Sequence, residues 1–202
     1  MSYKLQLWAS MKYGLGASSA TIKELEEGLG SADFYLLSKL GVVRSISKEL
    51  RYIPTALGGI GLYDLTCETT GPTLNSLLQH YGTETPLGIY LTTSLEKMQV
   101  ELGVRDCPFS YDFKKWGHLA TNCWVKSLWE KICTLKLDVE IDYKQLPLPR
   151  EYDSFIMEVM IDYLNTAEAK CFNRARIHQE ALTFSDICTL NGHTIDRAYL
   201  QD

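Results

Sequence analysis

The sequence predicts a mainly α-helical protein: a helical bundle in two halves with one short strand or hairpin. Apolar residues recur at every third or fourth position through most of the 202 residues, which is the period of an amphipathic helix. Glycine and proline stand where these periodic segments begin or end. With 46% hydrophobic and 22% charged residues, the composition is typical of a globular protein and excludes disorder. We expect one half at 1–105 and the other at 106–202, joined by the connection at 107–113.

The clearest helix of the first half begins after Thr21. Thr21 and Glu24 form the pattern of a capping box, and Gly41 has the place of a residue that ends a helix. Gly28 and Gly30 fall inside the pattern and favour a bend or a break there. The expected apolar face consists of Ile22, Leu25, Leu29, Ala32, Leu36 and Leu40.

A glycine-rich segment follows this helix. Gly58, Gly59 and Gly61 allow positive φ and close backbone approach, so we expect a tight turn between two elements.

Two further helices complete the first half. Proline suits the first turn of a helix, so we expect one helix after Pro72 and another from Pro86. Gly103 ends the second of these. Their apolar faces are expected at Leu74, Leu77, Leu78 and Tyr81, and at Leu87, Leu91, Leu95, Met98 and Leu102.

The second half combines helices with the one expected strand. Apolar and polar residues alternate at 137–143, which is the period of a half-buried strand, and Asn191-Gly192 is the signature of a two-residue hairpin turn. Helices are expected at 118–135, at 153–163 and, capped by Thr166, at 167 to about 182.

Charge and hydropathy restrict the function. The net charge of −5 excludes a protein that wraps nucleic acid by bulk positive charge, although a local basic face is compatible with it. No apolar run is long enough to span a membrane, and no secretory signal is evident, so we expect an intracellular protein of the cytoplasm or nucleus. None of the six cysteines forms a Cys-x-x-Cys pair, and we expect free thiols that act as small buried hydrophobes.

Motifs of enzymes and metal sites are weak. No glycine pair extends to a nucleotide-binding loop, and no serine lies in a nucleophile elbow, so we expect no catalytic centre, no cofactor and no metal. Two sets have metal-ligand side chains, but the first has unsuitable spacing and the second is explained as well by a solvated strand face. These sets are Cys171, His178, Cys188 and His193, and Asp138, Glu140 and Asp142.

Two basic clusters have helical spacing and could contact phosphates. Each also fits a solvated helix face paired with neighbouring acids such as Glu49 and Glu168. The residue pattern alone favours the solvated face. The clusters are Arg44, Lys48 and Arg51, and Lys170, Arg174 and Arg176.

The order of several motifs resembles the region downstream of the polymerase palm in retrotransposon-type, non-LTR-like reverse transcriptases. The similarity covers nearly the whole chain. It rests on Leu40-Gly41-Val42-Val43-Arg44, the stretch Leu50–Ile53, Gly58-Gly59-Ile60-Gly61-Leu62, Lys12-Tyr13-Gly14-Leu15, the helix Thr93–Gly103, the segment Trp124–Trp129, and Leu182–Ile187 with Asn191-Gly192.

The resemblance implies a thumb-like region at 1–105 and a connection-like region at 106–202. In such proteins this part holds an RNA or DNA template-primer duplex by its backbone, without base specificity. The family's palm, with its Tyr/Phe-x-Asp-Asp motif, and its fingers do not occur in this sequence. The resemblance therefore implies a non-catalytic fragment whose partners are the duplex and the missing palm and fingers of a parent polyprotein, an RNA-directed DNA polymerase. The residues expected at the backbone are Arg44, Lys48, Arg51, Gly58, Gly59 and Gly61.

A helical protein-interaction or structural module without nucleic-acid binding is the alternative. Its aromatic face would comprise Trp116, Trp124 and Trp129. Tryptophans at helical spacing usually pack inward, so we favour a core position for them over a partner surface. A fragment that exposes the apolar surface of a missing palm would also associate with itself.

Overall fold

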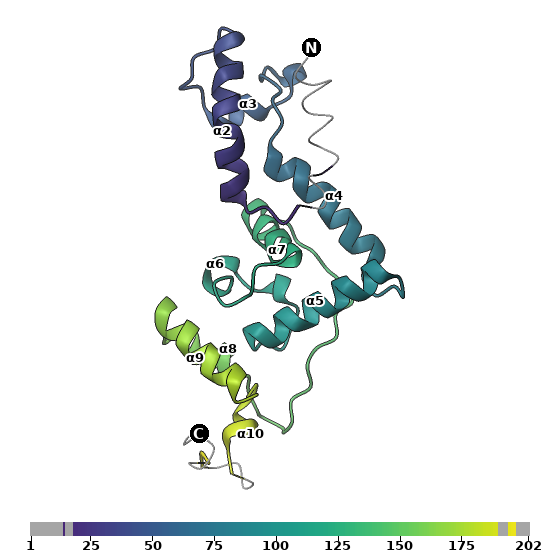
Figure 1. The fold of residues 1–202 in the computed structure, drawn as a ribbon, viewed down its shortest axis with the longest axis vertical. Helices are drawn as coiled ribbons and strands as arrows, with labels where there is room; N and C mark the ends of the chain where they lie inside the picture. Colours follow the sequence, from purple (N-terminus) through teal and green to yellow (C-terminus); the bar gives the residue numbers. More distant parts are fainter. Residues whose placement is uncertain (1–13, 15–17, 190–193, 197–202) are drawn as a thin grey trace.

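The computed structural model describes residue 14 and residues 18–189 and 194–196, and it is mainly helical, as predicted (Figure 1). The elements are α2 (Ile22–Lys39), α3 (Lys48–Tyr52), the 3-10 turn η2 (Thr55–Leu57), α4 (Leu65–His80), α5 (Pro86–Leu102), the 3-10 turn η3 (Pro108–Ser110), α6 (Phe113–Trp116), α7 (Trp124–Leu135), α8 (Ile156–Met160), α9 (Thr166–His178) and α10 (Phe184–Ile187).

The helices form a body with a projecting arm. In Figure 1, α2 and α3 lie at one end of the molecule, α4 leads away from them towards α5, and α9 and α10 lie at the other end. Helix α7 is central, because it contacts α2, α4, α5 and α6. The arm of α2 and α3 therefore meets the body at α4 and α7.

The body is held by one hydrophobic core. Its side chains come from α4, α5, η3, α6, α7, α8 and α9. Trp129 is completely buried in it, donates its ring N–H to the carbonyl of Tyr111 at 3.0 Å and meets the ring of Phe113 edge-on at 5.0 Å. Trp116 is also buried, so the core interpretation of these two tryptophans is confirmed. Core residues come from both sides of the expected boundary at 107–113, and the division into two domains stays a prediction.

Local end signals of α2 and α5 match the prediction. Thr21 and Glu24 form both hydrogen bonds of a capping box, and α2 runs through Gly28 without a break. Helix α5 begins at Pro86 and ends at Gly103, whose φ of 68° is the left-handed conformation that glycine tolerates. The expected apolar faces are less accurate, since Leu40 and Leu87 are exposed.

Helix α4 begins earlier than the proline signal indicates. Asp64 caps it by accepting from the N–H of Thr66 at 2.9 Å, and Pro72 lies inside the helix. The extra turns contain the buried Thr69 and Thr70, and the buried Thr73 follows Pro72; the hydroxyls of all three donate to carbonyls one turn back. The expected start at Pro72 is therefore wrong, because these threonines satisfy their own polar groups in a buried helix face.

Several boundaries of the second half are also corrected. Helix α7 begins at Trp124 rather than near 118, since Cys123 caps it. The helix expected at 153–163 is reduced to the five residues of α8. The cap of α9 is Asn165, which forms a capping box with Glu168, rather than Thr166, and the helix ends at His178. The other flanking residues of these expected helices lie outside any helix of more than one turn.

The strand expected at 137–143 is wrong, because this segment belongs to no helix or strand and pairs with no other segment among the residues that the structure describes. Its alternation has a different cause: Val139, Ile141 and Tyr143 are half-buried and pack against the core. The intervening acids Asp138, Glu140 and Asp142 are exposed, as expected for a solvated face. An extended chain on a helical surface thus produces the same period of two as a strand.

The described residues contain two isolated antiparallel bridges in place of a sheet, between Phe155 and Thr183 and between Cys188 and Ile195. The second bridge flanks Asn191-Gly192, which lies outside the described residues, as do Lys12, Tyr13 and Leu15.

All six cysteines are free, as expected, but none is fully buried. Cys67 and Cys171 are exposed, so the expectation of buried thiols is wrong. Within the part of the chain that the structure describes, no helix has the length and apolar character needed to cross a bilayer.

Candidate nucleic-acid interface

The segment 44–62 folds as one closed unit. After α3 the chain turns through η2 and returns along the same helix, where the N–H of Leu62 donates to the carbonyl of Arg51 at 2.8 Å. The N–H of Ile60 donates to the carbonyl of Leu50 at 3.0 Å. The glycine turn and the basic helix that the sequence singles out are thus fixed to each other.

The glycines have a structural role in closing this turn. Gly58 and Gly61 have φ of 83° and 70°, which side chains rarely adopt. At Gly59 a Cβ would lie 2.1 Å from the carbonyl oxygen of Ile53, so only glycine allows this close approach. These contacts bring Gly58, Gly59 and Gly61 beside α3.

Arg51 uses its guanidinium to organise the loop that precedes α3. Its Nε and Nη2 donate to the carbonyl of Ile46 at 3.2 and 3.0 Å, and Nη2 also donates to the carbonyl of Arg44 at 3.1 Å. The guanidinium carbon lies 5.4 Å from the centre of the Phe34 ring, a cation–π distance. The Arg51 side chain is therefore held in place.

Arg44 and Lys48 are exposed beside it. The Nε of Arg44 donates to the hydroxyl of Ser38 at 3.1 Å. Lys48, the first residue of α3, forms an ion pair with Glu26 of α2, and this hydrogen bond raises the pKa of the lysine. Both side chains are accessible from solvent.

The local charge is opposite to that of the whole chain. Residues 39–51 contain four cations and one acid, a net charge of +3, whereas the chain as a whole has −5. The fourth cation, Lys39, was missed by the motif analysis, and its amine lies 5.4 Å from the centre of the Tyr35 ring. The basic charge therefore extends back to the end of α2.

A polar pocket of about 250 Å³ lies between α2, α3 and the start of α4. Lys48 and Arg51 form part of its wall, together with the buried Asp33. Burial raises the pKa of Asp33, and the charge of Arg51 opposes this shift. Asp33 belongs to no sequence motif, and nothing in its neighbourhood along the chain indicates a site.

The second basic cluster, at residues 170–176, does not form a comparable exposed basic surface. Lys170 and Arg174 are exposed on α9, but Arg176 is buried and donates to the carbonyls of Val100 and Glu101 at 2.9 and 3.0 Å. These are carbonyls of the last turn of α5, which a cation stabilises. Arg176 therefore joins two helices and cannot contact a phosphate.

A larger cavity, of about 980 Å³, lies between the start of α2 and the start of α7. Among its lining residues are His118, Cys123 and Lys126. The Nε2 atom of His118 is buried without a hydrogen-bond partner, and burial lowers the pKa of His118.

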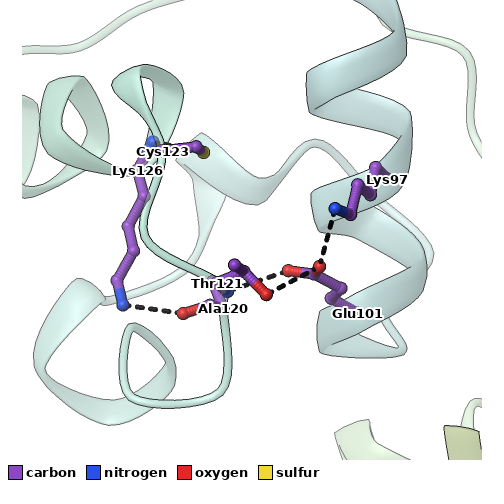
Figure 2. A network of polar contacts seen from close by, with 6 residues as sticks. All are labelled: Lys97, Glu101, Ala120, Thr121, Cys123 and Lys126. Carbon is purple, nitrogen blue, oxygen red and sulfur yellow. Dashed lines mark hydrogen bonds and ion pairs between the residues drawn. The ribbon is translucent and has the colours of Figure 1, made fainter. Parts of the chain in front are cut away.

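Figure 2 shows a polar network that includes Cys123 and Lys126, two of the residues that line this cavity. Glu101 of α5 accepts from the N–H and the hydroxyl of Thr121, both at 2.9 Å, and forms an ion pair with Lys97 at 3.7 Å. Lys126 Nζ donates to the carbonyl of Ala120 at 2.7 Å, and its own N–H donates to Cys123 Sγ at 3.4 Å. The network ties the end of α5 to the start of α7.

Metal ligands are not gathered in the part of the chain covered by the structure, where no three or more His, Cys, Asp or Glu residues lie together to hold an ion. His193 of the Cys/His set lies outside that part. Comparison with protein-family models, curated proteins and solved structures finds no match for this chain.

Proposed function

We propose that this chain is a non-catalytic module that holds the sugar–phosphate backbone of a nucleic-acid duplex without reading its bases. The site is the basic unit, defined as residues 39–62. The observation that supports it is the closed fold of this unit, in which the basic helix and the glycine turn are fixed to each other. Arg44, Lys48 and Gly58 are exposed on it. A backbone site requires cations in a fixed arrangement and a main chain that can approach closely.

Within this unit the three basic residues have different roles. Arg44 and Lys48 present their charges to solvent and are the groups that contact phosphates. Arg51 positions Arg44 through its hydrogen bond to the Arg44 carbonyl. The negative charge of the rest of the chain opposes such binding less at physiological salt than at low salt. The reason is that salt screens interactions between exposed charges that lie more than about 8 Å apart.

Binding of a fluorescent RNA–DNA hybrid duplex tests this proposal. The double variant Arg44→Ala/Lys48→Ala removes both exposed cations, and we expect its affinity to fall at least about tenfold. The matched control is Lys170→Ala/Arg174→Ala, which removes two exposed cations from α9 and is expected to bind like the wild type. Equal affinity of both variants would overturn the proposal.

A second candidate function, protein interaction or self-association, is favoured by apolar exposure on the same arm. Large apolar side chains are exposed along α2 and α3 and in the segments that flank α3; they are Phe34, Tyr35, Leu40, Val43, Leu50 and Leu57. An apolar surface of this kind is typical of a docking face. Its partner would be the palm and fingers of a reverse transcriptase-like protein, or a second copy of this chain.

Light scattering after size exclusion separates these partners. If the chain associates with itself, the measured mass should increase with protein concentration. The double variant Val43→Ser/Leu57→Ser should remove this increase. A monomeric mass at all concentrations would exclude the second copy.

A further inference from the structure

The pocket between α2, α3 and α4 contains a buried carboxylate oxygen that nothing in the described structure satisfies. Asp33 is only 6% exposed. Its Oδ2 accepts from the hydroxyl of Tyr52 at 3.2 Å, whereas Oδ1 has no hydrogen-bond partner. Leaving a buried acceptor unpaired costs about 1–3 kcal/mol, and more when the group is charged. Such an atom in a pocket wall is suited to accept from a ligand.

Neither cation of the pocket wall donates a hydrogen bond to Asp33 Oδ1. Lys48 forms an ion pair with Glu26, and Arg51 donates its hydrogen bonds to the carbonyls of Ile46 and Arg44. Arg51 is near enough to favour the ionised form of Asp33 but donates no hydrogen bond to it. Asp33 therefore keeps one carboxylate oxygen, Oδ1, without a donor.

A second carboxylate increases the negative potential. Asp64 also lines the pocket, and its charge repels that of Asp33. The Oδ1 of Asp64 is used as the cap of α4, where it accepts from Thr66 at 2.9 Å. A positive group between the two acids would relieve this repulsion, and the rings of Tyr52 and Tyr63 in the same wall suit a cation.

We propose that this pocket binds an organic cation, a primary ammonium or a guanidinium group, whose N–H donates to Asp33 Oδ1. A volume of about 250 Å³ accommodates such a group with a short aliphatic stem. The group can belong to a free amine or to a lysine or arginine side chain of a protein partner. A neutral nucleobase fits less well, because it supplies N–H donors without compensating the charge of the two carboxylates.

The proposal goes beyond the duplex-binding function and does not depend on it. Asp33 lies outside the basic unit, and replacing it removes no cation. Loss of cation binding with duplex binding intact, or the reverse, is therefore distinguishable.

Calorimetric titration of the full chain with four probes tests the proposal. The probes are n-propylammonium and spermidine as amines, acetyl-arginine-amide as the side-chain source, and guanosine as the nucleobase. The variant Asp33→Asn keeps an acceptor for Tyr52 but removes the charge and the free acceptor. Glu27→Gln, an exposed acid on the same helix, is the matched control.

We expect saturable binding of at least one cationic probe to the wild type and to Glu27→Gln, and at least about tenfold weaker binding to Asp33→Asn. The amines and the arginine derivative identify the source. Absence of saturation for all cations up to about 10 mM, equal binding to Asp33→Asn, or binding of guanosine alone would each overturn the proposal.

A measurement on the wild type covers the case in which Asp33→Asn fails to fold. The carbon-13 resonance of the Asp33 carboxyl is expected to shift as the cationic probe is added, with the same saturation as the calorimetric signal. A resonance that stays unchanged while the probe binds would place the cation elsewhere.

Discussion

The guanidinium of Arg51 donates to the main-chain carbonyl of Arg44 at 3.1 Å, so one arginine of the basic unit holds the backbone of another. A second carbonyl, that of Ile46, accepts from the same group. The loop between α2 and α3 is thus closed by the side chain that sequence analysis assigned to phosphate contact. Within this cluster of like charges, Arg51 therefore stabilises the loop, whereas Arg44 and Lys48 remain for binding.

Replacing Arg51 is expected to change stability, and replacing Arg44 is not. Arg51→Ala removes hydrogen bonds to two carbonyls and is expected to lower the free energy of unfolding by about 1–2 kcal/mol. Arg44→Ala removes an exposed side chain and is expected to change it by less than about 0.5 kcal/mol. Urea denaturation of both variants measures the difference. A stable Arg51→Ala protein would show that the loop does not need the guanidinium.

A methyl group at Gly59 is expected to disrupt the turn. The Cβ of Gly59→Ala would lie 2.1 Å from the Ile53 carbonyl, so the turn must move away from α3. Gly28→Ala is the matched control, because no atom lies within 4 Å of its Cβ and alanine favours a helix by about 1 kcal/mol over glycine. We expect a lower melting temperature for Gly59→Ala and a higher one for Gly28→Ala. Similar shifts in both would contradict the packing.

Arg176 is expected to be essential to the junction of α5 and α9. Its guanidinium donates to the carbonyls of Val100 and Glu101, and it packs against Gly103. Arg176→Met leaves these carbonyls without a donor, and we expect a loss of about 3 kcal/mol in the free energy of unfolding. The exposed neighbour Arg174 provides the control, since Arg174→Met should leave the unfolding midpoint nearly unchanged.

Lys131 is expected to destabilise the protein at neutral pH. It is 1% exposed, and burial lowers its pKa below the usual 10.5. The folded state therefore disfavours its charge, and this cost is complete below the folded pKa and disappears as the pH rises towards 10.5.

Lys131→Met removes this cost, and we expect it to raise the free energy of unfolding by about 1–2 kcal/mol at pH 7. The gain should shrink in denaturation experiments at higher pH. Lys114→Met, at an exposed position, is the control. A gain that is constant with pH would show that packing rather than charge is responsible.

The sequence predicts best the features that neighbouring residues determine. The ends of α5 follow from Pro86 and Gly103, and the start of α2 follows from Thr21 with Glu24. Segment 137–143 shows the limit of such reasoning. Its alternation correctly places Val139, Ile141 and Tyr143 against the core, whereas Leu137 is exposed. A strand also requires a partner segment, which no local pattern specifies.

The candidate site was predictable to the same extent. Helical spacing groups Arg44, Lys48 and Arg51, and the structure brings them together. Their ion-pair and pocket partners Glu26 and Asp33 come from α2, where they lie about two turns apart, and both are far from α3 along the chain. Such tertiary pairings depend on how the helices pack, and sequence periodicity does not contain them.

The salt dependence of hybrid-duplex binding tests the central proposal most directly. Each phosphate contact contributes about 0.9 to the slope of log affinity against log salt concentration. We expect the wild type to show a steep slope, and the triple variant Arg44→Ala/Lys48→Ala/Arg51→Ala to show weaker binding with a slope that is shallower by about 2 or more. An unchanged slope in a folded triple variant would show that these residues do not contact the backbone and would contradict the account.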